Sequence, residues 1–134
     1  MANRTITLSG RAPVTINEDN WPVIAKAADK DWDNQYEFQA NQISKWFVGV
    51  RQHADGRAIV YATYSYTSNW QGARCYAAKR GEMLPAGSPA QDICKAIKNV
   101  CRDIAGAEHY GEDANRWDTL ANECIADMPA EVID

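Results

Sequence analysis

The sequence predicts an α+β fold, an antiparallel sheet of three to four strands with an N-terminal helix and a C-terminal helical pair packed on one face. Three observations support it. Asp55 and Gly56 separate two runs of alternating β-type residues, which is typical of a hairpin turn. Ser88 and Pro89 begin a segment with helical apolar spacing, and a second such segment ends before Pro129. Because most strands precede these helices, we expect the sheet's other face to be open.

The first two elements are a predicted strand and a predicted helix. Polar and apolar residues alternate over 5–8 and resume over 13–16, so we expect one strand bent at Gly10. Asp19 or Asn20 can then cap a helix that runs to about Asp29, with Pro22 in its first turn. The residues that would share the apolar face of this helix are Trp21, Ile24, Ala25 and Ala28.

A three-stranded antiparallel meander is expected to fill the middle of the chain. The segment from 30 to 40 fits either a long loop or a short irregular strand. Alternation then runs from 43 to 53, and a run rich in β-branched and aromatic residues covers 57–66. After a turn, the run over 72–79 can pair back onto that strand.

Two helices are predicted at the C-terminal end. Ser88, Pro89 and Gln91 have the spacing of a capping box, and Gly106 ends the first helix. The second ends before Pro129, and the short loop between them favours an antiparallel pair. Their apolar stripes consist of Ile93, Cys94, Ile97, Val100, Cys101 and Ile104, and of Trp117, Leu120, Ala121, Cys124, Ile125 and Met128.

Length and composition favour one folded domain over residues 1–134, with 46% hydrophobic and 24% charged residues. The N-terminus lacks the apolar core of a secretory signal, and no stretch has the apolar length that spans a bilayer. We therefore expect a cytoplasmic protein with no membrane partner.

Catalytic, cofactor and metal motifs are missing from the sequence. The four cysteines form no Cys-x-x-Cys pair, and only His53 and His109 are available to complete a zinc site or to act as a base. Glycine-rich nucleotide loops are also missing. We therefore expect no enzyme, no cofactor and no metal, and we interpret Cys94, Cys101 and Cys124 as buried thiols.

The meander combines aromatic and basic residues, and strand alternation must place some of them outside the core, separating Tyr61 from Tyr64 and Tyr66. Exposed Tyr, Trp and Arg anchor protein interfaces, and they also stack on single-stranded bases. Cross-strand aromatic pairing that only covers the sheet is the third interpretation. The candidate binding residues are Trp46, Arg51, Tyr61, Tyr64, Tyr66, Trp70, Arg74 and Tyr76.

Charge is unevenly distributed along a chain whose net charge is −4. Residues 43–106 hold nine Lys and Arg against four Asp and Glu, whereas residues 107–134 hold one against eight. Such asymmetry indicates a surface for a charged partner, and an acidic tail can imitate nucleic acid toward a basic one. The net acidity counts against a general nucleic-acid binder.

Several segments resemble small uncharacterised proteins of proteobacteria and of their phages and mobile elements. They are 12–16 (APVTI), 21–24 (WPVI), 51–57 (RQHADGR) and 123–129 (ECIADMP). The resemblance implies a setting in which small acidic domains inhibit host defence, as anti-CRISPR proteins do, and it carries over no catalytic residue.

The leading hypothesis is a non-enzymatic binding protein that occupies a host macromolecule through the meander's exposed face or the acidic C-terminal helices. The expected partner is a host protein or protein complex, and nucleic acid is the other candidate. The alternative is a single-stranded nucleic-acid-binding module that uses the basic aromatic sheet face.

Overall fold

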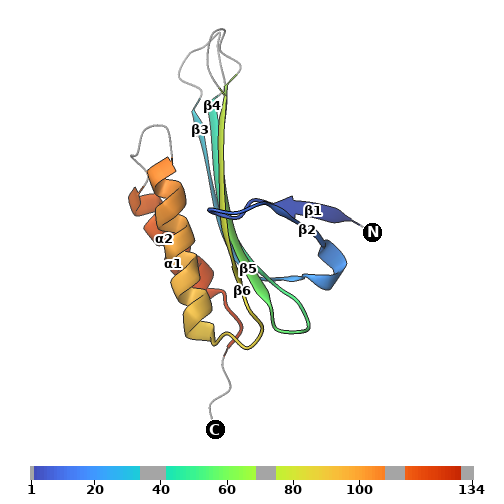
Figure 1. Ribbon diagram of the computed structural model, residues 1–134. Coiled ribbons are helices and arrows are strands. Elements are labelled where there is room, and N and C mark those ends of the chain that lie inside the picture. The colour runs from blue at the N-terminus through green and yellow to red at the C-terminus, as the bar shows by residue number, and fades with distance from the viewer. Residues whose placement is uncertain (1, 34–41, 69–74, 108–113, 131–134) are drawn as a thin grey trace.

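The computed structural model describes residues 2–33, 42–68, 75–107 and 114–130, and it has an α+β architecture (Figure 1). Six strands and a short 3-10 helix precede two α-helices in the described part of the chain. The elements are β1 (Asn3–Ile6), β2 (Val14–Asn17), η1 (Glu18–Asn20), β3 (Val23–Asp33), β4 (Gln42–Gln52), β5 (Ala58–Ser68), β6 (Tyr76–Leu84), α1 (Ala90–Ala107) and α2 (Ala114–Ala126).

The central sheet has the strand order β3-β4-β5-β6, and every neighbouring pair is antiparallel. The predicted turn between β4 and β5 is confirmed, because the amide of Gly56 donates to the carbonyl of His53 at 2.9 Å. The amide of His53 donates to the carbonyl of Arg57 at 2.9 Å, which closes the hairpin. The meander is therefore present as predicted, with β3 as an additional strand at its edge.

The predicted N-terminal helix is wrong, because residues 23–33 form the edge strand β3. Ala25 pairs with Val50 and Ala27 with Val48, so the small side chains of β3 face the helices. Lys26 and Ala28 point to the opposite face. The segment's alanines fit either periodicity, and pairing with a complete β4 overrides its helix propensity.

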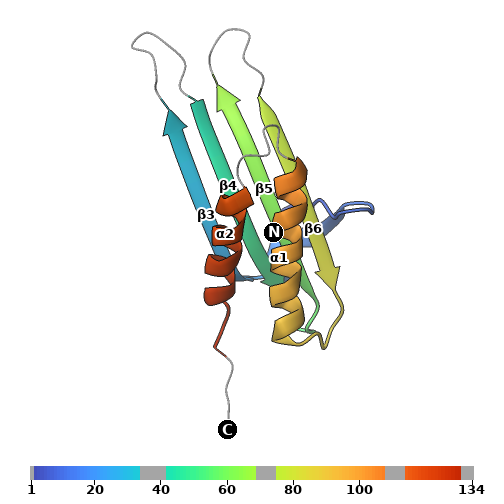
Figure 2. The same cartoon turned by 90° about the vertical axis from the view of Figure 1, so that its left-hand side faces the viewer.

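The two α-helices cover one face of the sheet, as predicted. Helix α2 lies over β3 and β4, and α1 lies over β5 and β6 (Figure 2). The layer between them is an apolar core whose fully buried members include Ile97, Ile104 and Trp117. Neither α1 nor α2 combines the length with the apolar character that a bilayer-spanning helix requires.

The other face is partly covered, which corrects the expectation of an open face. Strands β1 and β2 form an antiparallel hairpin, with Ile6 opposite Val14, where the sequence predicted one bent strand. This hairpin projects from the side of the sheet opposite the helices (Figure 1). It closes a second, smaller core that consists of Ile6, Leu8, Ile16, Trp21, Ile59 and Tyr61.

Gly81 lets the segment after β1 approach the edge of β6. A Cβ at this position would lie 2.5 Å from the carbonyl oxygen of Thr7, so no other residue fits without movement of the backbone. The amide of Ser9 donates to the carbonyl of Gly81 at 2.8 Å. The N-terminal segment is therefore attached to the sheet by backbone contacts as well as by apolar packing.

Both edges of the central sheet carry side-chain contacts to the backbone. On β3, the amide of Lys26 donates to the Asp127 carboxylate, just after α2, at 2.9 Å. On β6, the Arg80 guanidinium donates to the carbonyl of Lys79 at 2.8 Å, and its Nε lies 3.5 Å from Asp103 on α1.

Candidate binding surfaces

The predicted aromatic and basic residues are mostly inside the protein. Trp46, Arg51, Tyr61 and Tyr64 are 3%, 8%, 6% and 7% exposed. Trp70 and Arg74 lie outside the described residues. The predicted separation of Tyr61 from Tyr64 is confirmed, since Tyr61 belongs to the smaller core and Tyr64 to the core under the helices. Whether any of these residues contacts a partner stays a prediction, and their burial leaves little of them on the surface.

Tyr66 and Tyr76 are half-buried and pack against the helix-side core. They are direct partners on β5 and β6. The Tyr76 hydroxyl donates to the carbonyl of Ala107, the last residue of α1. Tyr76 therefore connects the sheet to the end of this helix.

Trp46 is held between the sheet and α2. The Arg116 guanidinium lies 3.9 Å from the centre of its ring, and the Tyr64 ring centre is 5.6 Å away. Arg116 also binds the Asp29 carboxylate at 2.7 Å, so a single side chain joins α2 to both β3 and β4. This geometry indicates a packing role for Trp46, although its buried Nε1 has no hydrogen-bond partner among the residues that the structure describes.

Arg51 organises a polar network under the N-terminal hairpin. Its Nε donates to the Tyr61 hydroxyl at 3.1 Å, and Nη1 donates to the Trp21 carbonyl at 3.0 Å. Its Nη2 lies 3.6 Å from the Glu18 carboxylate, which also accepts from Arg4. The hydrogen bond from Arg4 is the main reason why the pKa of Glu18 is lowered. Arg51 therefore stabilises the attachment of the hairpin.

A basic surface that the sequence analysis missed lies on the uncovered part of the hairpin-side face. We call it the lysine face, and it is defined by Lys26, Lys30, Lys45 and Lys79. Lys30 and Lys45 are direct cross-strand partners. All four side chains are exposed. The signal was the alternation of charge within β3, which the helix prediction concealed.

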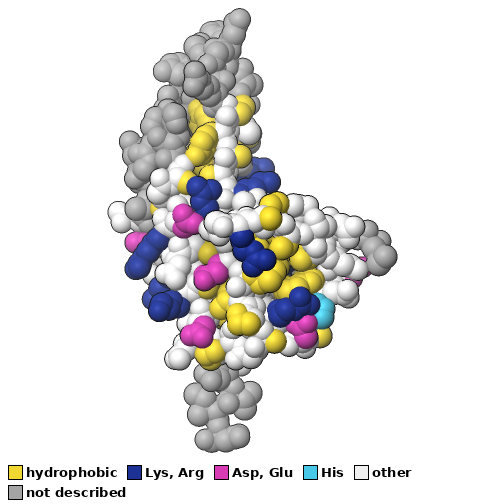
Figure 3. All heavy atoms as spheres, in the orientation of Figure 1, with side chains coloured by type: hydrophobic (Ala, Val, Ile, Leu, Met, Phe, Trp, Pro, Cys, Tyr) yellow, Lys and Arg dark blue, Asp and Glu magenta, His cyan; other side chains and the backbone are white. Residues whose placement is uncertain are grey.

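Charges are separated between the two sides of the sheet. Asp29, next to Lys30 in sequence, points to the helix side, where it binds Arg116. Among the described side chains of the four strands, no Asp or Glu shares the lysine face. The face also presents the half-buried Phe47 and Thr63, which are cross-strand partners. In Figure 1 the sheet continues upward past the β1–β2 hairpin. Figure 3, in the same orientation, shows Lys and Arg side chains above the hairpin.

The exposed surfaces of the two helices differ in charge. Helix α1 exposes Lys95, Lys98 and Arg102 together with Asp92 and Asp103, whereas α2 exposes Asp118 and Glu123. The C-terminal segment that is acidic in the sequence therefore exposes carboxylates on α2. Much of that segment lies outside the described residues.

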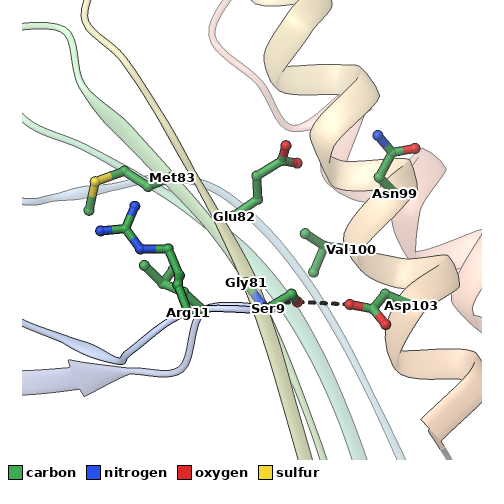
Figure 4. Close-up of a pocket in the computed structure, with 9 residues that line it drawn as sticks. Ser9, Arg11, Gly81, Glu82, Met83, Asn99, Val100 and Asp103 are labelled. Atoms are coloured by element: carbon green, nitrogen blue, oxygen red, sulfur yellow. Dashed lines mark hydrogen bonds between the residues drawn. The ribbon is translucent and has the colours of Figure 1, made fainter.

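A surface hollow of about 310 Å³ lies between the N-terminal segment, β6 and α1. In Figure 4, Glu82, Asn99 and Asp103 lie on its helix side, and Arg11 and Met83 lie on the opposite side of β6. The Ser9 hydroxyl donates to Asp103 at 2.7 Å. Among the described residues no histidine lines the hollow, so the Asp103 carboxylate is the basic group beside this serine.

His53 lines an open hollow of about 650 Å³ beside the β4–β5 turn. Its Nδ1 accepts a hydrogen bond from the Asp55 amide at 3.0 Å and lies 3.2 Å from the Asp55 carboxylate. Arg57 binds the same carboxylate at 2.8 Å, and its backbone amide is the main cause of the lowered pKa of Asp55. Within the described part of the chain, neither Ser nor Cys lines this hollow, so His53 and Asp55 have no nucleophile beside them there. His109 lies outside the described residues.

The cysteines and carboxylates form no metal site in the part of the chain that the structure describes. Cys101 and Cys124 are buried between the helices, as predicted, while Cys94 is only half-buried. Burial raises the pKa of both buried thiols to about 12, and slow reaction of these thiols in the folded protein stays a prediction.

Comparison with protein-family models, curated proteins and solved structures finds no match.

Proposed function

We propose that the chain is a non-enzymatic binding protein whose lysine face docks on an acidic surface of a host protein. The observation that carries this proposal is the separation of charge across one sheet. Four lysines from three strands, β3, β4 and β6, share one face, and the carboxylate of Asp29 on the same sheet points to the other.

The lysine face suits an anionic partner because its charges have the same sign. Lys30 and Lys45 are directly opposite each other, a position in which like charges repel and an incoming carboxylate attracts both. Lys79 lies on β6, two strands away from Lys45, and so extends the positively charged surface across the sheet. The long aliphatic stems of lysine and the half-buried Phe47 provide apolar area beneath the charges.

The burial of the aromatic residues favours a protein partner over single-stranded nucleic acid. Base stacking needs exposed rings, and Trp46, Tyr61 and Tyr64 are occupied in the two cores. The acidic surface of α2 and the net charge of −4 also repel a long polyanion. An inhibitor of host defence encoded by a mobile element is one class of protein that would act in this way.

The test compares two defined anionic probes on variants of the lysine face. We expect a labelled Glu-rich peptide to bind the wild-type chain at low salt, with an affinity that falls as salt is added. The K45E/K79E variant should weaken this binding about tenfold, because two attractive charges become repulsive. Fluorescence anisotropy measures both, and a mixed-sequence single-stranded DNA oligonucleotide serves as the second probe.

The matched control is K95E/K98E on α1, which makes the same charge change on the other side of the molecule. It should leave peptide affinity within about twofold of wild type if the lysine face is the site. Equal losses in both variants, or no peptide binding at low salt, would refute the proposed surface. Oligonucleotide binding that is tighter than peptide binding would favour the nucleic-acid alternative instead.

A further inference from the structure

A small cavity lies where the N-terminal hairpin meets the uncovered part of the sheet. Its volume is about 70 Å³, and β1, the residue after it, β5 and β6 line it. The lining residues are Arg4, Thr5, Ile6, Thr7, Tyr61, Ala62, Thr63, Lys79 and Arg80. The cavity adjoins the lysine face, with which it shares Lys79.

Strand alternation shows which sheet side chains can face this cavity. Tyr61, Thr63 and Lys79 belong to the hairpin-side face, since Tyr61 is in the smaller core and Thr63 pairs with Lys79. Ala62 is in the helix-side core, and Arg80 reaches Asp103 on α1. The sheet therefore offers the cavity an ammonium group and hydroxyls, and β1 adds a guanidinium.

The electrostatic balance at this junction is positive. None of the described residues that line the cavity carries a carboxylate. Among the cations of the lining, Arg4 binds Glu18, and the Arg80 Nε lies 3.5 Å from Asp103 on α1. Three cationic lining residues, Arg4, Lys79 and Arg80, thus accompany two carboxylates, so one positive charge is in excess. An additional negative charge at this position is attracted rather than repelled.

The hydrogen-bond donors of the cavity match an oxyanion. Arg51 holds the Tyr61 hydroxyl in the network under the hairpin, so the threonines are the hydroxyl donors of the cavity. Thr7 and Thr63 contribute hydroxyls, while the Thr5 hydroxyl is bonded to Thr15 at 3.0 Å. The volume of about 70 Å³ is about twice the 30 Å³ that a water molecule occupies in the liquid, which suits a small tetrahedral group.

We propose that this cavity binds a phosphoryl-type oxyanion, with Lys79 and Arg4 as its cationic ligands and Thr63 as a hydroxyl donor. Charge-assisted hydrogen bonds of this kind are the strong ones in phosphate recognition. The anion is either free inorganic phosphate or a phosphoryl group carried by a protein partner. The site does not depend on the proposed docking of an acidic protein, because a free anion can enter it.

The test is a titration of the isotope-labelled full chain with inorganic phosphate at constant ionic strength, followed by two-dimensional NMR. We expect saturable shifts at the amides of Thr7, Thr63 and Lys79. K79M should weaken the affinity about tenfold, because it removes a charge-assisted bond. T63V should weaken it about threefold. K98M on α1 removes the same charge elsewhere and should leave the affinity unchanged.

Two further arms identify the source of the anion. If O-phosphothreonine within a short peptide binds at least tenfold more tightly than phosphate, the phosphoryl group belongs to a partner. Affinities within a few-fold of each other assign the site to the free anion. Shifts that do not saturate, or equal affinities for wild type, K79M and T63V, would overturn the site. If the unphosphorylated Glu-rich peptide still binds the lysine face in that case, the docking proposal stands without the cavity.

Discussion

The two faces of the central sheet are buried in different ways. On the helix side, α1 and α2 cover all four strands and enclose a core of aliphatic, aromatic and cysteine side chains. On the hairpin side, a two-stranded unit covers part of the sheet over a smaller core. Arg51 and Glu18 form a charged network at the edge of that smaller core.

This difference separates stability from recognition. The helix side has the apolar burial that dominates folding free energy. The hairpin side buries less apolar surface and is held in part by charged contacts. It leaves the lysine face uncovered. The same sheet thus supplies a packed surface to one side and a charged surface to the other.

The largest expected effect comes from a cavity in the helix-side core. Ile97→Ala should lower the free energy of unfolding by about 3 kcal/mol, since Ile97 is fully buried between α1 and the sheet. Ile16→Ala in the smaller core should cost about 1–2 kcal/mol, because fewer neighbours surround the deleted atoms. Urea unfolding followed by circular dichroism measures both. Equal losses would show that the two cores contribute alike.

A smaller effect is expected where the hairpin segment meets β6. Gly81→Ala places a Cβ 2.5 Å from the Thr7 carbonyl oxygen, so we expect a loss of about 1–2 kcal/mol. Hydrogen exchange should quicken at Ser9 and in β1 while α1 keeps its protection. Gly106→Ala, in open space within α1, is the control and should stabilise the chain by about 0.5 kcal/mol. Faster exchange throughout both helices would contradict this local role of Gly81.

The smallest effect is a pH dependence confined to the hairpin. The pKa of Glu18 lies below its ordinary value of 4.5, chiefly because Arg4 donates a hydrogen bond to its carboxylate. Its contribution to stability is therefore present above pH 4.5 and is lost as the pH falls through the lowered pKa. As the pH falls through this range, hydrogen exchange at β1 and β2 should accelerate before exchange in α1 does. E18Q should remove this difference, and an unchanged profile in E18Q would exclude Glu18 as its cause.

Sequence reasoning predicted best where local signals agreed with the tertiary structure. Asp55 and Gly56 specify the β4–β5 turn by their own conformational preferences. The apolar stripes of α1 and α2 each pack against the same face of the sheet, so their helical spacing is also the pattern that the tertiary structure requires. Helix α1 begins at Ala90, directly after the predicted start signal of Ser88 and Pro89. The Ser88 hydroxyl, which the sequence predicted to be part of a capping box, donates to the Pro85 carbonyl at 2.7 Å.

Prediction failed where a segment fitted two periods or where the covering element was distant in sequence. Residues 23–29 satisfy helical and strand spacing alike, and only pairing with β4 decides between them. The hairpin that buries Tyr61 and Arg51 lies more than 30 residues before them in sequence, so no local pattern indicates their burial. The lysine face was hidden for the same reason, because its position depends on the correct identity of β3.

The side chains at the sheet edges have a consequence for the behaviour of this protein in concentrated solution. Strands of 11 residues with free backbone groups offer a template on which a second chain can add. Here Asp127 holds the amide of Lys26 on β3, while Ser9 and Arg80 occupy the carbonyls of Gly81 and Lys79 on β6. At these positions the edges are closed to strand addition, which protects the fold against edge-to-edge polymerisation. The lysine face stays accessible, because these contacts lie at the edges of the sheet.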